Sequence, residues 1–343
     1  MRIFIALLLA ILTIQPIWAD ETIPVEPGPT LKAIRDRGHL ICASSDPLPG
    51  FAQAGEDGLW TGFDVDVCRA IAVAVFNDPS KMEFVALSGD ARFAQLQTGA
   101  VDLIARNASW TMRRDTGYAA HYVAPSFFDG QAFMVPQGLG VVSAYELDKV
   151  TICVVDEPEQ VANLEEFFFS TQSDYTTRLY EDREDLAVAY SSGLCNAVSA
   201  SASWLNAVRR SLKEPATHRI LPERISKGAF GPMVRSGDDQ WFDIVEWTLY
   251  TLIGAEEAGI TALNIASLSA AKTHRIRRIL GLEGSFGPGI GLDAHFMANV
   301  IKTVGNYGEI FERNFGPATG AAVLRGQNSL WINGGLIYAP PIE

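Results

Sequence analysis

Residues 39–43 read HLICA and residues 63–76 read FDVDVCRAIAVAVF, and these two segments decide the fold. The first is a short apolar run that predicts a buried strand, and the second repeats its apolar side chains with the period of a helix. Residues 81–87 and 101–105 predict two further strands, with a helix between them at 91–99. Because strand and helix alternate, this part of the chain predicts an α/β unit with a largely parallel sheet.

The same alternation returns in the middle of the chain. The expected elements are a strand at 150–155 (VTICVV), a helix at about 158–170, a strand at 178–180, a helix at 185–191 and a strand at 197–199. The sequence therefore predicts two α/β units, each with one pair of cysteines. From residue 238 onward we expect mostly helix, because residues 240–258 carry a strong apolar repeat of helical period.

The N-terminus has the parts of a secretory signal peptide. A positive start at residues 1–2 precedes an almost wholly apolar run at residues 3–14, and a short alanine-terminated exit follows. We therefore expect a signal peptide at residues 1–19 and a Pro-rich linker at 20–29. The apolar run of about 12 residues is shorter than the ~20 that a membrane span needs. An uncleaved anchor stays open as an alternative, because Ile17 is not the small residue that cleavage sites prefer.

The chain is acidic, with a formal net charge of -13 over 343 residues. Loss of the signal peptide would remove one arginine and make the mature chain slightly more negative. This balance makes nucleic acid a poor partner, since binding to a phosphate backbone relies on positive charge. The densest basic run, at residues 272–278, is expected to be a solvated helix face. No later segment is long and apolar enough to span a membrane, so we expect no membrane insertion of the mature chain.

Four cysteines agree with export to an oxidising compartment. They are Cys42, Cys68, Cys153 and Cys195. Four cysteines allow three disulfide connectivities. If the chain forms two lobes, pairing within each lobe gives Cys42–Cys68 and Cys153–Cys195, and each bond would contribute ~3–4 kcal/mol in the chain-entropy description. Four buried free thiols are the alternative.

Sequence spacing offers no catalytic or metal-binding set. The histidines are scattered, and the sequence contains no HExxH, GxSxG or CxxC segment. SAAK at 269–272 matches a pattern short enough to arise by chance. The glycine-rich GSFGPGIG at 284–291 lacks the residues of a phosphate-binding loop. We therefore expect no metal site, no cofactor and no enzymatic activity.

Longer segments resemble a known family. They are TGFDVDVCRAIA at 61–72, WTMRRDT at 110–116, FFDGQ at 127–131, GDDQWFDIV at 237–245, GNYGEIFERN at 305–314 and YAPP at 338–341. On these segments the chain resembles the type II periplasmic binding proteins of polar amino-acid ABC transporters (solute-binding protein family 3). Within that family it looks most like the binding component of the general L-amino-acid importer. The resemblance covers nearly the whole mature chain and includes all four cysteine positions.

The resemblance implies an α/β, bilobal type II periplasmic-binding-protein fold, with two α/β lobes joined by two crossing hinge segments. Carried over to this chain, the first lobe is 27–131 plus 230–343 and the second is 132–229. The implied function is periplasmic: the protein binds a small polar ligand, an L-amino acid or a related carboxylate, between the lobes and delivers it to an ABC-transporter permease. Closure of the hinge on the ligand would create the form that the permease recognises. We expect the mature protein to be a monomer.

The family holds the α-carboxylate of its ligand with an arginine, and Arg114 matches that position. A guanidinium can pair with a carboxylate through two parallel hydrogen bonds. Ser109 matches a hydroxyl that adds a hydrogen bond, and Asn107 lies two residues before it. Without the resemblance, Arg114 would be interpreted as a surface arginine.

Three apolar side chains are expected near the same ligand. Leu48 and Phe51 match the positions where the family covers the ligand with apolar groups. Trp110, next to Ser109, would add another wall. Each of the three could equally belong to the core.

The second lobe departs from the family pattern. Where the family has a Gly-Thr turn at a helix N-terminus, which receives the ligand carboxylate, this chain reads DEPE at 156–159. Acidic residues and proline also suit an ordinary first helical turn. The family's aspartate for the α-amino group is replaced by Ser201, and charge-assisted hydrogen bonds are roughly twice as strong as neutral ones. Either Glu157 or Glu159 takes over the ammonium group, or the ligand is not a standard α-amino acid.

Two other functions on the same fold stay open. An enzyme similar to the cyclohexadienyl dehydratases would need a general acid or base, and Glu157 and Glu159 are the only candidates. A sensor would present the same kind of ligand to a receptor instead of a permease. The identity of the ligand is not fixed by the sequence.

Overall fold

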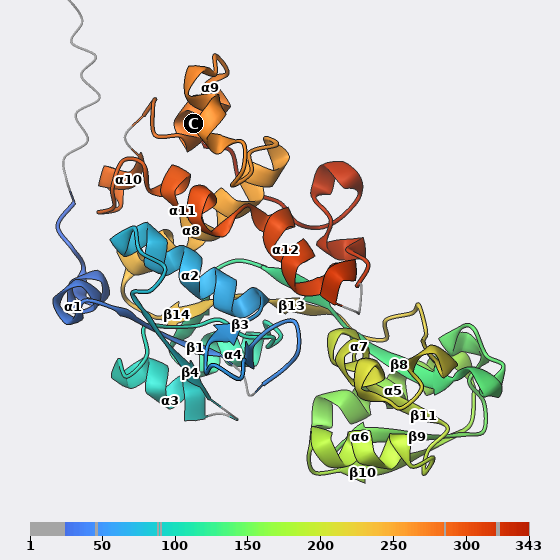
Figure 1. The fold of residues 1–343 in the computed structure, drawn as a ribbon. Coiled ribbons are helices and arrows are strands. Elements are labelled where there is room, and N and C mark those ends of the chain that lie inside the picture. Colours follow the sequence, from blue (N-terminus) through green and yellow to red (C-terminus); the bar gives the residue numbers. More distant parts are fainter. Residues whose placement is uncertain are drawn as a thin grey trace, which may run out of the picture.

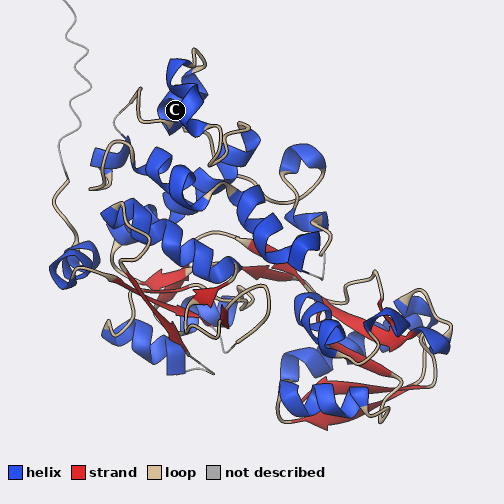
Figure 2. Cartoon of the chain, viewed as in Figure 1, coloured by secondary structure: helices blue, strands red, loops and turns tan. Residues whose placement is uncertain are grey.

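A computed structural model describes residues 25–44, 47–87, 89, 91–284, 286–319 and 323–342. The expected signal peptide and the first half of the expected linker lie outside these residues. The chain forms two lobes, each built on its own five-stranded sheet with helices packed against it (Figure 1, Figure 2). The predicted α/β, two-lobed fold is therefore confirmed.

The sheet of the first lobe has the strand order β4-β1-β5-β14-β6. Its strands are β4 (Met82–Ala86), β1 (Leu40–Ser44), β5 (Leu103–Ile104), β14 (Met233–Arg235) and β6 (Ala120–Tyr122). β1 runs parallel to both β4 and β5, and Cys42 pairs with Phe84 on one side and Leu103 on the other. β14 is antiparallel to β5 and β6. The predicted parallel core of this lobe is confirmed, and β14 and β6 extend it.

Helices cover both faces of this first sheet. The helices of this lobe are α1 (Pro29–Arg37), α2 (Phe63–Phe76), α3 (Ala91–Thr98), α4 (Met112–Gly117), α8 (Asp239–Glu257), α9 (His274–Ile279), α10 (Phe286–Gly289), α11 (Phe296–Val304) and α12 (Tyr307–Phe315). α2, α8 and α11 pack together on one face, and α3 lies on the other (Figure 1). Trp241 of α8 is fully buried, and its indole N–H donates to the Asp102 carbonyl at 3.0 Å. The expected mostly helical C-terminal part is thus confirmed as one side of the first lobe.

The sheet of the second lobe has the order β10-β9-β11-β8-β12. Its strands are β10 (Tyr175–Tyr180), β9 (Val150–Val155), β11 (Ala197–Ser201), β8 (Gln131–Pro136) and β12 (His218–Ile220). Its helices are α5 (Pro158–Thr171), α6 (Arg183–Ser191) and α7 (Ala202–Ser211). β9, β10 and β11 are parallel to one another, whereas β8 and β12 run antiparallel. The three predicted strands form the parallel part, and the sequence did not predict β8 and β12.

Short elements complete the chain. They are the two-stranded ribbon of β2 (Gln53–Ala54) and β3 (Trp60–Thr61), and 3-10 turns at Gln137–Leu139, Ala144–Glu146, Pro215–Thr217, Ile265–Ala270, Pro317–Thr319, Gly326–Asn328 and Trp331–Asn333. Among the described helices, none has the length and apolar character that crossing a bilayer requires.

The lobes are connected by two short strands that pair with each other. β7 (Phe127–Asp129) leads into the second lobe, and β13 (Gly228–Phe230) returns from it, in antiparallel register (Figure 1). These are the two crossing segments that the resemblance implied. Gly130 follows β7 at a place where a Cβ atom would lie 2.4 Å from the Ser226 carbonyl oxygen, so a side chain would collide with backbone. The residue limits predicted for the two lobes stay a prediction.

A buried asparagine from the C-terminal part holds the outer side of this hinge. The Asn328 amide donates to the Phe128 carbonyl at 2.9 Å, and its oxygen accepts from the Phe128 N–H at 2.6 Å. The side chain therefore continues the β-ladder on a side of β7 where the described residues form no further strand. Tyr307 adds a hydrogen bond from its hydroxyl to the Ser126 carbonyl at 2.9 Å. The hinge strand is thus fixed by residues that lie about 200 positions later in the chain.

Each lobe contains one disulfide. Cys42–Cys68 joins β1 to α2, and Cys153–Cys195 joins β9 to the segment just before β11. The Cα atoms are 6.1 and 5.8 Å apart, within the usual range for a disulfide. Pairing within each lobe is therefore confirmed, and the alternative of four free thiols is wrong.

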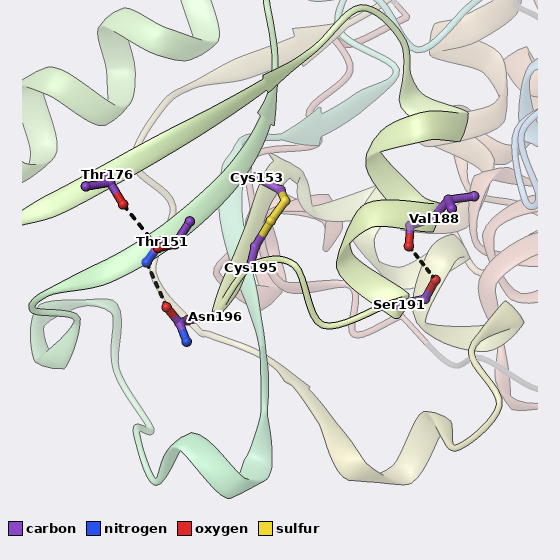
Figure 3. The surroundings of a disulfide bond; sticks show 7 residues. All are labelled: Thr151, Cys153, Thr176, Val188, Ser191, Cys195 and Asn196. Atoms are coloured by element: carbon purple, nitrogen blue, oxygen red, sulfur yellow. Dashed lines mark hydrogen bonds between the residues drawn. A yellow bond between two sulfur atoms is a disulfide. The ribbon is translucent and has the colours of Figure 1, made fainter.

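The second disulfide closes a loop that contains α5, β10 and α6. Figure 3 shows it beside a hydrogen bond from the Thr151 N–H to the Asn196 side-chain oxygen, 2.8 Å long. Thr151 also contacts Thr176 of β10 through their hydroxyls, at 3.1 Å. The Cys153–Cys195 disulfide thus lies where three neighbouring strands and the end of α6 meet.

We predict that the double variant Cys153→Ser/Cys195→Ser loses about 3–4 kcal/mol of unfolding free energy, because the 42-residue loop is no longer closed in the unfolded chain. Urea denaturation followed by circular dichroism measures the loss. Ser191→Ala is the matched control, since this nearby hydroxyl only donates to the Val188 carbonyl of its own helix. An unchanged midpoint in the double variant would show that the bond contributes nothing.

Candidate functional site

The candidate site is defined by the carboxyl ends of the parallel strands in both sheets. In open α/β sheets, ligands bind outside these ends. In the first lobe, the loop after β5 carries Asn107, Ser109 and Trp110, and its backbone reaches the hinge: the Trp110 N–H donates to the Ala229 carbonyl of β13 at 2.7 Å. In the second lobe the corresponding edge also begins at the hinge, because Ser201 pairs with Gln131, the first residue of β8, which is separated from β7 by Gly130 alone. The two edges therefore meet at the hinge.

The structure brings together three of the predicted residues in the first lobe. The Arg114 guanidinium donates to the Ser109 carbonyl at 2.9 Å, and the Tyr122 hydroxyl donates to the same oxygen at 2.8 Å. Trp110 stacks on the Tyr122 ring, with centroids 5.3 Å apart, and remains 37% exposed. Arg114 lies in the first turns of α4, whose N-cap Thr111 accepts a hydrogen bond from the Arg114 N–H. A cation, an exposed ring and a serine thus share one short segment.

The other predicted residues of the first lobe lie deeper. Phe51 is only 1% exposed and packs against the rings of Phe63, Phe127, Phe230 and Phe315. Leu48 is also buried, in the same core. Phe51 and Leu48 therefore support the loop after β1 from inside.

Asn107 has a buried side-chain oxygen for which the described residues offer no hydrogen-bond partner. It follows Arg106 in the loop after β5, at the same edge as Ser109. An unsatisfied acceptor at such a position is available to a donor group of a ligand. Its ligand role, like those of Leu48 and Phe51, stays a prediction.

A buried carboxylate lies beneath this edge. Asp64, in the first turn of α2, is almost completely buried and near the backbone of Asn107. Burial raises the pKa of Asp64 to about 7, and the positive charge of Arg106 opposes this rise only in part. Asp64 belongs to the TGFDVDVCRAIA segment at 61–72, which by itself predicts no role for this carboxylate.

In the second lobe, the predicted acidic residues lie at the start of α5. Glu157 is its N-cap, Pro158 begins the helix, and Glu159 lies in the first turn. Both glutamates are exposed, and the Glu157 carboxylate accepts a hydrogen bond from the Gln160 amide at 2.7 Å. Because folding leaves these two carboxylates in water, it has not already cost the free energy of desolvating them, and they can offer negative charge to a ligand.

Ser201 is the N-cap residue of α7, at the end of β11. Its hydroxyl oxygen is buried and has no hydrogen-bond partner among the described residues. Ser201 and Glu157 follow adjacent parallel strands, so they lie on the same edge. The structure thus places the predicted second-lobe residues on one edge, and their ligand roles stay predictions.

The sequence did not indicate two charged residues, Arg183 of the second lobe and Asp129 of the hinge strand β7. Arg183 is the first residue of α6, after β10, and its guanidinium lies 5.9 Å from the ring centre of Trp204 on α7. Burial lowers the pKa of Arg183, and the negative charges of Glu157 and Asp129 act in the opposite direction. Its position directly after a predicted strand of a parallel sheet was the signal that could have identified it.

Asp129, at the end of β7, is the second of these residues. Its buried carboxylate accepts hydrogen bonds from the Gly130 N–H at 2.8 Å and from the Ser203 N–H at 3.2 Å. The Ser203 hydroxyl also donates to it. Burial raises the pKa of Asp129. The hinge strand is therefore tied to the first turn of α7.

A pocket of about 280 Å³ also lies against the hinge. Its walls include Asp129, Ser203, Arg224 and Asn328, and it lacks the predicted ligand residues. It lies where the C-terminal part of the first lobe approaches the second lobe, and is distinct from the edge residues described above. Among the described residues, no group of three or more His, Cys, Asp or Glu side chains is arranged to hold a metal ion.

Comparison with known proteins gives the family. Residues 40–258 match the profile of the bacterial extracellular solute-binding proteins, family 3. The chain belongs to this family. The resemblance found in the sequence is therefore confirmed.

Two curated relatives of this family 3 protein match nearly end to end. The chain is 45% identical to the glutamate/glutamine/aspartate/asparagine-binding protein BztA of Rhodobacter capsulatus, over 92% of this chain and 93% of that protein. It is 44% identical to the general L-amino acid-binding periplasmic protein AapJ of Rhizobium johnstonii, with the same coverage. Both are named as binding proteins.

A solved structure of a family relative agrees. An ABC transporter periplasmic binding protein from Brucella ovis with glutathione bound superposes with a TM-score of 0.86 and is 40% identical. The match covers 92% of this chain and 99% of that chain. The two-lobed architecture is thus shared with a protein that holds a small, polar, multiply charged ligand.

We predict that Asp64→Asn flattens the pH dependence of stability. Because burial raises the pKa of Asp64 from 3.8 to about 7, the folded state holds its proton more tightly than the unfolded state does. This contribution is complete below about pH 4 and is lost as the pH rises to about 7, a change on the order of 4 kcal/mol. The asparagine variant should therefore be more stable than the wild type at pH 8 and similar at pH 4, by urea denaturation.

The control is Glu56→Gln, an exposed carboxylate of the same lobe. It should follow the wild-type pH profile. If Asp64→Asn also follows it, folding does not raise the pKa of Asp64 and the assignment is wrong.

Proposed function

We propose that the protein is the periplasmic solute-binding component of an ABC importer, which binds an L-amino acid or a related small carboxylate between its lobes and delivers it to a membrane permease. The observation that carries this proposal is the pair of polar strand edges that meet at the β7–β13 hinge. Family membership and the names of the two amino-acid-binding relatives support the same ligand class.

Arg114 is proposed to bind the ligand's carboxylate. Only one of its guanidinium nitrogens has a hydrogen-bond partner among the described residues, the Ser109 carbonyl, so donors remain for a carboxylate. The existing bond fixes the plane of the guanidinium, which reduces the ordering cost of binding. Ser109 and Asn107 would add polar contacts, and Trp110 would cover one side.

Glu157 or Glu159 is proposed to bind the ligand's ammonium group in place of an aspartate at Ser201. Glu157 is already oriented by Gln160, which favours it over Glu159. The alternative is a ligand without an α-amino group, which would leave both carboxylates to water. A ligand panel decides between these two readings.

Binding rather than catalysis is proposed for the same edge. A general acid or base of a cyclohexadienyl-dehydratase-like enzyme would need a carboxyl group held in a buried site, where its pKa can be adjusted to the reaction. Glu157 and Glu159 are both exposed. A sensor role would use the same binding site with a different membrane partner.

We also propose export and maturation. Residues 1–19 would be removed as a signal peptide, and the two disulfides suit the oxidising periplasm. The mature protein would act as a monomer, with lobes 27–131 plus 230–343 and 132–229 closing about the hinge.

We predict that Arg114→Gln weakens carboxylate binding by about 10–100-fold, since hydrogen bonds to a charged partner contribute about 1.5–3 kcal/mol. Titration calorimetry with L-glutamate, L-glutamine, L-aspartate, L-arginine and glutathione measures it. Arg113→Gln is the control, because this neighbouring side chain is exposed and carries the same charge.

Equal losses in the two variants would assign the effect to net charge rather than to a specific contact. If the wild type binds none of the five compounds, the proposed ligand class is wrong.

A further inference from the structure

Arg183 lies at the ligand-facing edge of the second lobe. Three parallel strands, β9, β10 and β11, end there: Glu157 lies two residues after β9, Arg183 lies three residues after β10, and Ser201 is the last residue of β11. Figure 1 shows α6, which begins with Arg183, in the same lobe as α5 and α7. Arg183 is thus the one cation among the first residues that follow these three strands.

The guanidinium of Arg183 is held in place but lacks a polar partner. It lies over the Trp204 ring, 5.9 Å from its centre, and is partly buried. Within the described part of the chain, neither a hydrogen bond nor an ion pair to this guanidinium is found. Removing a charged group from water without giving it hydrogen bonds is costly, so the position favours an incoming anion.

The nearby carboxylates are engaged elsewhere. Asp129 accepts hydrogen bonds from Gly130 and Ser203, and Glu157 accepts one from Gln160. Both act on Arg183 only as charges at a distance. A purely structural counter-ion would form a direct ion pair with one of these carboxylates. Arg183 forms none with either of them.

We propose that Arg183 binds a second anionic group of the ligand, at the end opposite to the carboxylate that Arg114 holds. This inference rests on the proposed function. The ligand class is then an amino acid, or a small γ-linked peptide, with an additional carboxylate. The ammonium group faces Glu157, and the two carboxylates face the two arginines, so the charges of the site and of the ligand alternate.

Arg183 is thus a specificity-determining residue. A partly buried cation that is matched by a carboxylate discriminates against the neutral amide, because the amide leaves the guanidinium incompletely paired. We expect the wild-type protein to bind an acidic ligand at least about tenfold more tightly than its neutral counterpart. This is the factor in affinity that the loss of one hydrogen bond to a charged group produces.

Calorimetry with two matched pairs of probes tests the proposal: L-glutamate with L-glutamine, and glutathione with its glycyl monoethyl ester. Arg183→Gln should lower the affinity for the acidic probe at least tenfold and for its neutral partner less than threefold, which removes the preference. Arg178→Gln is the matched control, an exposed arginine of β10 in the same lobe, and should leave both affinities within twofold. Arg183→Lys should retain part of the preference, because it keeps the charge without the two-pronged geometry.

Each remaining outcome has a definite meaning. Equal losses for both members of a pair would make Arg183 a structural residue and overturn the proposal. Wild-type binding without a preference for the acidic probe overturns it even if Arg183→Gln does not fold, while the proposed function stands. If the wild type binds neither pair nor any amino acid, the proposed function fails first and this inference fails with it.

Discussion

The antiparallel pairing of β7 with β13 is the constraint on which the two-lobed structure depends. The chain enters the second lobe through one of these strands and leaves it through the other, so the relative position of the sheets is set by this pair. Asn328 completes the ladder on the outer side of β7, and Asp129 ties the end of β7 to the start of α7.

The same constraint assembles the binding edges. The Ser109–Trp110 segment lies against β13, and Gln131 begins β8 one residue after β7, opposite Ser201. The first lobe contributes a cation at Arg114, and the second contributes both signs of charge, at Glu157 and Arg183. In the proposed binding mode, a ligand that carries alternating charges is matched only when both edges contact it, which would link recognition of the ligand to lobe closure.

Local patterns were sufficient to predict much of the fold. The helix at 63–76 was predicted with its observed bounds, and β9 at 150–155 likewise, because apolar period and length are visible within the segment itself. β8 and β12 were missed, since their strand character depends on pairing with a sheet formed by distant segments. The site was harder to predict: Arg114, Ser109 and Trp110 share one segment, whereas Arg183 lies over the Trp204 ring only through the tertiary fold. Phe51 was expected near the ligand but is buried among four aromatic rings. That burial cannot be predicted from its neighbours in sequence.

The distance between the lobes, with and without ligand, tests the central claim most directly. All four native cysteines are in disulfides, so spin labels can be placed on new cysteines at Glu56 and Glu166, exposed positions in the first and second lobes. Pulsed electron paramagnetic resonance then measures the label-to-label distance before and after a saturating acidic amino acid is added. The account predicts that the ligand shortens the distance and narrows its distribution. Saturating binding that leaves the distribution unchanged would contradict a ligand held jointly by the two edges.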